Sequence, residues 1–268
     1  MSRRGGRARA AAVALIAGLA AAPGRPAQAA WTGEPGRGQI IVTSTLTRAE
    51  DGFDDDGRRR PMAKTHKIEI APWIEYGVAA GYLAVLQPTW SRLDTDTRYD
   101  QGLAKLFLGL RCRLWSKEDE VLSLQPGLTL ALGPEGRAAR LGSAPDKAEL
   151  RLLWGDGFEI PHPFGEGAVP AFVATEFAPR LSEDGGVTLL ADATLGLKDG
   201  KGGMILFQIF NEWTVDAPTG PFRKHQLQPS IVRPLDDGLF LQAGVSWVFA
   251  GAATPAETGL IGAVWLRF

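Results

Sequence analysis

The chain has 268 residues, 45% of them hydrophobic, eight tryptophans and a formal net charge of −1 at pH 7. Its mean hydropathy is −0.05, and no segment after residue 29 offers 18 consecutive apolar residues, which argues against a membrane protein built from helices. The apolar content is nevertheless too high for a disordered chain. A β-barrel satisfies both conditions, because alternating strands hide a lipid-facing surface inside an average hydropathy.

The first 29 residues have the pattern of a secretory signal peptide. Four arginines precede residue 10, an apolar stretch at 11–22 is too short to span a bilayer, and Ala27-Gln28-Ala29 is a small-residue cleavage site. Gly5-Gly6 disfavours a twin-arginine signal, and no cysteine follows the cleavage site to carry a lipid. We therefore expect Sec export and cleavage near Ala29 in a Gram-negative bacterium.

The mature chain carries an excess of acid. Five of the 29 basic residues and none of the 30 acidic residues lie in the signal, which leaves 24 basic against 30 acidic residues and a net charge of −6. Nucleic acid is therefore not an expected partner. Cys112 is the only cysteine, so an intramolecular disulfide cannot form.

A period of two in the apolar residues predicts extended strands along the mature chain. A periplasmic lead-in at 30–38 comes first, and the barrel should occupy residues 39–268. Twelve strands are expected at about 39–47, 65–76, 82–93, 103–115, 121–132, 148–154, 171–181, 187–197, 204–215, 225–233, 239–249 and 258–268. This even number predicts an all-β, antiparallel transmembrane barrel with both termini in the periplasm.

Loop lengths support this topology. The long polar segments 48–64, 94–102 and 133–147 fall on the outer side of the membrane, and the short turns at 77–81 and 116–120 fall on the periplasmic side. The segment 155–167 fits no strand or turn clearly.

The segment around residue 110 shows most clearly which side chains face the lumen. Leucines alternate there with cations, and a cation exposed to lipid at the membrane midplane costs about 2–4 kcal/mol, so the cations should point inward or sit at an interface. The same argument on the other strands predicts an inner wall that mixes both charges. Its expected members are Lys67, Glu69, Glu75, Lys105, Arg111, Arg113, Arg151, Glu176, Arg180, Asp192, Gln208, Glu212, Gln226 and Gln228.

The final segment, 258–268, alternates up to the last residue. Leu260, Gly262, Val264 and Leu266 share one face, and the chain ends on Phe268. An apolar terminal strand that ends in an aromatic residue resembles the last strand of bacterial outer-membrane barrels. The resemblance implies that Phe268 belongs to a signal for the barrel assembly machinery.

Several short motifs extend the resemblance over most of the mature chain. They look like those of the outer-membrane barrels grouped as "meta-pathway of phenol degradation" proteins: 31–39 (Trp-Thr-Gly-Glu-Pro-Gly-Arg-Gly-Gln), 53–57 (Phe-Asp-Asp-Asp-Gly), 73–77 (Trp-Ile-Glu-Tyr-Gly), 149–154 (Glu-Leu-Arg-Leu-Leu-Trp), 226–230 (Gln-Leu-Gln-Pro-Ser) and 265–268 (Trp-Leu-Arg-Phe). The resemblance implies a 12-stranded barrel that takes up small, often hydrophobic or aromatic compounds. It supplies no binding residues.

A passive channel is the leading function. Arg111, Arg113, Arg151 and Arg180 facing Glu176, Asp192 and Glu212 would create a transverse field that orients solutes; alternatively, the charges pair across a narrow, packed interior. A structural or adhesive barrel working through its outer loops, in contact with outer-membrane lipids and lipopolysaccharide, is the second hypothesis.

An outer-membrane lipid enzyme is the third hypothesis and the least supported. Only His66, His162 and His225 offer an imidazole base, and no Gly-x-Ser-x-Gly motif is present. His225 and Ser230 are five residues apart on one strand and should face opposite ways.

The acidic stretch 51–57 lacks the closing glutamate of a calcium loop, so self-paired Asp and Arg side chains are expected there. No cofactor or metal is predicted.

Overall fold

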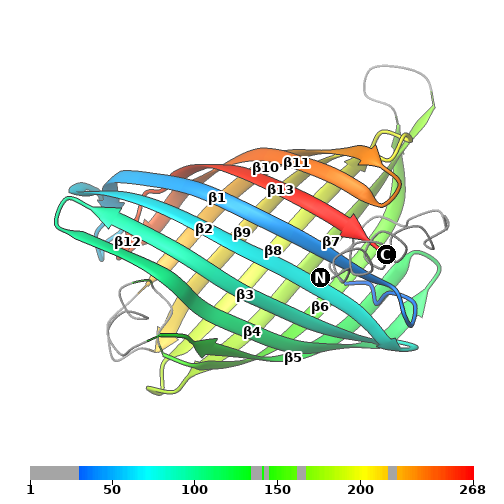
Figure 1. Ribbon diagram of the computed structural model, residues 1–268, viewed down its shortest axis with the longest axis horizontal. Coiled ribbons are helices and arrows are strands. Elements are labelled where there is room, and N and C mark those ends of the chain that lie inside the picture. The colour runs from blue at the N-terminus through cyan, green and yellow to red at the C-terminus, as the bar shows by residue number, and fades with distance from the viewer. Residues whose placement is uncertain (1–29, 134–140, 142–144, 162–166, 217–221) are drawn as a thin grey trace, which may run out of the picture.

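The computed structural model describes residues 30–133, 141, 145–161, 167–216 and 222–268. Twelve long antiparallel strands form a closed barrel, because β1 pairs with β2 on one side and with β13 on the other (Figure 1). The strands are β1 (Gly38–Phe53), β2 (Arg59–Ala79), β3 (Tyr82–Thr95), β4 (Arg98–Lys117), β5 (Glu120–Ala131), β6 (Lys147–Pro161), β7 (Ala168–Ser182), β8 (Val187–Lys198), β9 (Met204–Asp216), β10 (Arg223–Asp236), β11 (Leu239–Ala252) and β13 (Thr258–Arg267). A two-residue strand, β12 (Thr254–Pro255), pairs with the far end of β1.

The predicted all-β antiparallel barrel of twelve strands is therefore confirmed. Its closing seam is regular: ten consecutive residues of β1, from Gln39 to Arg48, pair with β13. At the end of the seam, Gly38 and Phe268 exchange two backbone hydrogen bonds of 2.8 and 3.0 Å. Within the described residues, no helix is long and apolar enough to cross a membrane.

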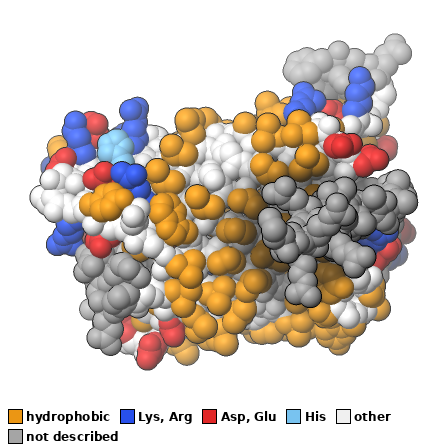
Figure 2. Space-filling view, in the orientation of Figure 1, with side chains coloured by type: hydrophobic (Ala, Val, Ile, Leu, Met, Phe, Trp, Pro, Cys, Tyr) orange, Lys and Arg blue, Asp and Glu red, His pale blue; other side chains and the backbone are white. Residues whose placement is uncertain are grey.

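Side chains alternate between an apolar exterior and a buried interior. On β13, Leu260 is 62% exposed and Val264 45%, whereas Ile261 is 4% and Trp265 5% exposed. The same alternation on the other strands produces an apolar band around the middle of the barrel, with charged side chains gathered at its two ends (Figure 2). A surface of this kind matches the apolar core of a bilayer between two aqueous phases.

The two ends of the barrel differ, and we name them by their contents. The terminal end carries the start of β1, residue Phe268 and the two-residue turns after β2, β4 and β10. The loop end carries the connections from β1 to β2, from β5 to β6 and from β11 to β13.

Several strands continue beyond the predicted boundaries at the loop end. Segments 48–64 and 94–102 were expected to be loops, but β1 and β2 pair as far as Phe53 and Arg59, and β3 and β4 as far as Thr95 and Arg98. The apolar alternation disappears there because both faces of these extensions are polar. The polar composition was therefore mistaken for the end of the strand.

The unassigned segment 155–167 belongs largely to regular strands. β6 runs on to Pro161 and β7 begins at Ala168. The sequence did not show the apolar alternation of a strand here, because two alternate positions are glycines, Gly155 and Gly157, which have no side chain. His162 lies outside the described residues, as does the predicted signal peptide.

The hairpin at the tip of β1 and β2 is held by its own charges. The Asp54 carboxylate accepts hydrogen bonds from the amides of Arg58 (2.7 Å) and Asp56 (3.1 Å) and from Nε of Arg60 (3.2 Å). The Arg58 amide is the largest cause that keeps the pKa of this carboxyl below its ordinary value. The acidic side chains are thus occupied by neighbouring donors, which accords with the self-paired loop expected from sequence.

Candidate functional site

The interior of the barrel is the candidate site, and its wall has two parts. Inward side chains toward the loop end are mainly charged or amide-bearing, whereas those toward the terminal end are mainly apolar. The division follows the strands: on β7, for example, Phe172 lies near the terminal end and Arg180 near the loop end. These two surfaces follow one another along the axis of the barrel.

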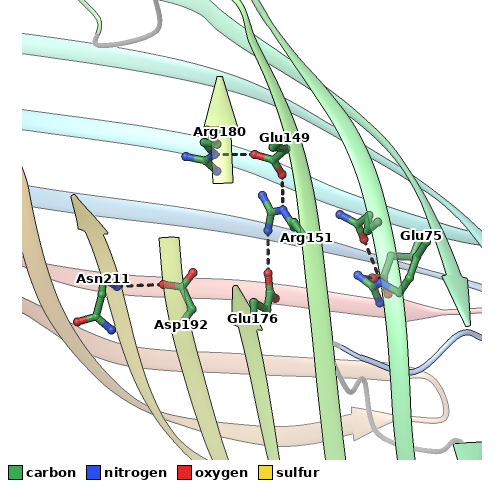
Figure 3. A network of polar contacts seen from close by, with 9 residues as sticks. Glu75, Glu149, Arg151, Glu176, Arg180, Asp192 and Asn211 are labelled. Atoms are coloured by element: carbon green, nitrogen blue, oxygen red, sulfur yellow. Dashed lines mark hydrogen bonds and ion pairs between the residues drawn. The ribbon is translucent and has the colours of Figure 1, made fainter. Parts of the chain in front are cut away.

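Glu149 organises the charged part of the wall. Its side chain is fully buried and accepts hydrogen bonds from Arg151 on its own strand and from Arg180 on β7, the latter at 2.5 Å from Nε. Arg151 also reaches Glu176 (Nη1 to Oε2, 2.9 Å), and Arg180 reaches Glu212 (Nη1 to Oε1, 3.7 Å). Figure 3 shows Arg151 between Glu149 and Glu176. The network follows the wall from β6 across β7 to β9.

A gap in the sheet lies beside this network. β8 and β9 pair at Leu190 and Glu212 and again at Ala193 and Ile209, but not in between. There the Asp192 carboxylate accepts the backbone N–H of Asn211 at 3.0 Å, and the Asn211 side chain donates to the carbonyl of Ala191 (Figure 3). An inward carboxylate thus replaces a carbonyl acceptor of the ladder.

A second charged group lies on β2, β3 and β4. Lys67 Nζ is 2.9 Å from Glu69 Oε2, and Ser91 Oγ donates to the other oxygen of Glu69 at 3.2 Å. Lys105 faces Glu69, Lys67, Arg180 and Glu212. This lysine therefore connects the second group to the Glu149 network electrostatically.

Arg111 is the most buried charged residue in the interior, with 1% of its surface exposed. Its guanidinium uses three nitrogens: Nε donates to Gln125 Oε1 (2.9 Å), Nη2 contacts Glu75 Oε1 (3.1 Å) and Nη1 donates to the carbonyl of Trp31 (3.2 Å). Gln39 donates to the second oxygen of Glu75. Arg111 thus joins β2, β4 and β5 to the segment that precedes β1.

That segment folds inward. Ala30 is fully buried and Trp31 packs with it against Val121 and Leu153 on the inner wall, and Ser123 Oγ donates to the carbonyl of Ala30 at 2.7 Å. Residues 30–38 were expected to be a lead-in in the periplasm, but the described part of the chain begins inside the terminal end of the barrel. No periodicity marks this segment, so the sequence offered no sign that it enters the lumen.

The rest of the terminal half is mainly apolar. One cluster contains Phe172, Met204, Leu206, Val232, Phe240, Ala263 and Trp265, with Ile41 against it. On another part of the wall, the rings of Trp73 and Phe107 stack with centroids 5.9 Å apart, and the Arg151 guanidinium lies 5.1 Å from the Phe107 centroid. The sequence analysis missed this lining because it sought polar residues on the inner face. The inward alternation of Trp265 and Ala263 was the available signal.

Most of the polar residues predicted for the inner wall are among these contacts. Gln228 donates to Gln208 at 3.0 Å, and Gln208 donates to Thr194 at 3.3 Å; Gln226 follows on the same strand face as Gln228. Arg113 differs, because it is exposed at the terminal rim beside Gly81. The arginines predicted to create a transverse field do not face acids across the lumen. Arg111, Arg151 and Arg180 pair with acids along the wall.

Among the described residues, His225 and Ser230 do not assemble a hydrolytic site. His225 Nδ1 lies 2.8 Å from Asn211 Oδ1, and its ring lies against Phe249, whose side chain is exposed on the outer surface. Ser230 is buried and instead accepts a hydrogen bond from Gln242. The two residues face opposite ways, as their spacing predicts. The described residues contain no group of three or more His, Cys, Asp or Glu able to hold a metal ion.

Among solved structures, the barrel is similar to the COG4313 outer membrane channel from Pseudomonas putida F1. The TM-score is 0.71 and the sequence identity 11%, over 91% of this chain and 100% of that one. It is also similar to the NanC porin, with a TM-score of 0.51 and 5% identity over 85% of this chain and 100% of the porin chain. A scan of known protein families and a search of curated proteins find no match. The likeness establishes the fold: the chain is a β-barrel of the outer-membrane type.

Gly155 offers a direct test of how Trp31 is seated. A Cβ atom on Gly155 would lie only 2.1 Å from the Trp31 ring, which must therefore shift. We expect Gly155→Ala to expose Trp31 and to red-shift its fluorescence, measured in a protein that keeps Trp31 and has its other tryptophans replaced by phenylalanine. Gly262→Ala is the matched control, because nothing lies within 4 Å of a Cβ there. Equal spectra for both variants would contradict the seating.

Proposed function

We propose that this protein is a passive channel in the outer membrane of a Gram-negative bacterium, through which small solutes diffuse. The observation that carries the proposal is the inner wall, where a mainly charged and amide-bearing half is followed by a mainly apolar half. A barrel with a purely structural role needs no continuous lining of this kind. Charged groups along a pore tune the ions and solutes that pass.

The ion pairs indicate that the charged side chains line the lumen and do not block it. Arg151, Arg180 and their glutamates lie on β6, β7 and β9, on the same side of the barrel. Such pairs hold one another against the wall, and the space along the axis need not be filled by them. Twelve strands also lie between the filled barrels of about eight strands and the open porins of about sixteen.

The segment 30–38 narrows this pathway at the terminal end. Ala30 and Trp31 occupy the interior next to Val121 and Leu153, and two hydrogen bonds from the wall, those of Ser123 and Arg111, hold their carbonyls. We infer that displacement of this segment widens the channel. We place the terminal end in the periplasm, in keeping with its short turns and with the predicted cleavage of a signal near Ala29.

The short motifs shared with the "meta-pathway of phenol degradation" barrels support a finer assignment. They favour small hydrophobic or aromatic compounds as solutes, and the apolar half of the lumen accords with that class. Phe268 would serve assembly through the barrel assembly machinery, while outer-membrane lipids and lipopolysaccharide would surround the exterior. The structural or adhesive alternative relies on the outer loops alone.

The test is conductance of the refolded protein in a planar lipid bilayer. We expect discrete steps, with an ion selectivity that changes when charges of the inner wall are reversed. Folding is checked first by the shift in gel migration between unheated and boiled samples in detergent. A silent bilayer from protein that passes this check would contradict the channel and favour the structural barrel.

A further inference from the structure

Arg267 lies at the terminal mouth of the lumen, and two nitrogen atoms of its guanidinium have no hydrogen-bond partner among the described residues. Nε and Nη2 are both buried, and among the described residues no hydrogen-bond acceptor reaches either atom. A buried donor left unpaired is costly, about 1–3 kcal/mol and more when charged. Arg111, in the same interior, shows the contrast, because all three of its nitrogens have acceptors.

The two unpaired nitrogens form one recognition edge. Nε–H and the neighbouring Nη2–H of a guanidinium point the same way, and together they match the two oxygens of a carboxylate in a bidentate pair. A single water or a lone carbonyl leaves one of them unsatisfied. The edge is therefore suited to a planar, two-oxygen anion.

Aromatic rings surround this guanidinium. Its Cζ lies 4.4 Å from the centroid of Phe240 and 5.9 Å from that of Trp265. Both rings belong to the apolar cluster of the terminal half, whose member Phe172 lies under a second cation, with Lys198 Nζ 5.5 Å from its centroid. The same place thus combines two cations with three aromatic faces.

The cations of this site outnumber the acids near them. Among the described residues no ion pair includes Arg267, and Lys198 has one acid, Asp119, and one cation, Arg267, as its charged neighbours. Arg233, which lies at the same end, is paired instead with Asp199 at 2.7 Å. The local field at the mouth therefore favours an anion.

We propose that Arg267 and the aromatic cluster of Phe172, Phe240 and Trp265 bind the carboxylate and ring of a small aromatic carboxylic acid at the terminal mouth. The carboxylate pairs with Nε and Nη2 of Arg267, and the ring lies against the apolar cluster, with Lys198 adding positive charge. The inference rests on the proposed channel function and names a solute class for it: singly charged aromatic anions.

The test is a binding measurement that does not require conduction. Benzoate is titrated into the protein purified from outer membranes in detergent, and quenching of tryptophan fluorescence is followed. Benzyl alcohol, which has the ring without the charge, and acetate, which has the charge without the ring, are the comparison ligands. We expect saturable quenching by benzoate and at least about tenfold weaker binding of the other two.

Variants then locate the site. Arg267→Gln should weaken benzoate binding by about tenfold or more, and Arg267→Lys should restore part of it, because a lysine keeps the charge but not the two-pronged edge. Arg233→Gln is the matched control and should bind benzoate as the unaltered protein does. Each variant is first checked for heat-modifiable migration. If Arg267→Gln fails to fold, Lys198→Gln replaces it and should cause a smaller loss of benzoate affinity.

Two results would overturn the site: equal benzoate binding in Arg267→Gln, or equal affinity for benzyl alcohol and benzoate. The channel is tested separately. A protein that binds benzoate through Arg267 but gives a silent bilayer supports this site and contradicts passive conduction. A protein that conducts but does not bind benzoate supports the channel and contradicts this site.

Discussion

Replacing Arg111 with methionine is expected to increase conductance several-fold and to destabilise the barrel. Methionine fills much of the volume but donates no hydrogen bond, so the carbonyl of Trp31 loses its partner on the wall and the segment 30–38 is held less tightly, by Ser123 and by the packing of Trp31. Glu75 is left buried without its cation, and breaking a buried pair in this way costs about 3–5 kcal/mol. Single-channel conductance and the temperature of the gel-migration shift measure the two effects.

A second substitution separates these effects. In Arg111→Met/Glu75→Gln the uncompensated charge is removed, so stability should largely return while the segment stays loosely held and conductance stays high. Trp31→Ala should also raise conductance, with little change in the migration temperature, because it removes the ring and leaves the Arg111 pair intact. Unchanged conductance in all three variants would show that residues 30–38 do not limit the pathway.

The fold was predictable because lipid imposes a period of two. Every strand that crosses the apolar band needs outward apolar residues, and the leucines at 106, 108, 110 and 114 alternate with the inward cations for that reason. Outside the band this requirement ends. The extension of β2 from Arg59 to Lys64 is exposed on both faces, so nothing in its sequence separates a strand from a loop.

The site was predictable only in part. A charge in a membrane strand must point inward, which places Arg111, Arg151 and Glu176 on the inner wall. Which acid each cation meets depends on the register between neighbouring strands, and a single sequence does not define it. The inward position of Trp31 depends on Gly155, which lacks a side chain where the ring lies, more than 120 residues away in the chain.

Replacing Glu149 with glutamine is expected to shift the channel toward anions and to weaken the wall between β6 and β7. Glu149 is the shared acceptor of Arg151 and Arg180, and its side chain is fully buried. Without its charge, Glu176 and Glu212 remain as the acids paired with these two cations, and the Arg180 to Glu212 contact is already long at 3.7 Å. The lumen therefore gains one net positive charge at its most densely charged level, and the reversal potential in a KCl gradient should move toward that of chloride.

Removing a cation instead of an acid should shift the reversal potential in the opposite direction. Arg180→Gln removes one cation from the same network, so its reversal potential should move toward that of potassium. Glu50→Gln is the matched control: Glu50 is 65% exposed at the loop end, 3.7 Å from Lys64, where water and salt screen its charge, and neither selectivity nor stability should change. If Glu149→Gln and Glu50→Gln gave the same reversal potential, permeating ions would not pass near the Glu149 network. Opposite shifts for Glu149→Gln and Arg180→Gln are what a pathway lined by these two side chains requires, because each ion then feels the net charge of the wall at close range.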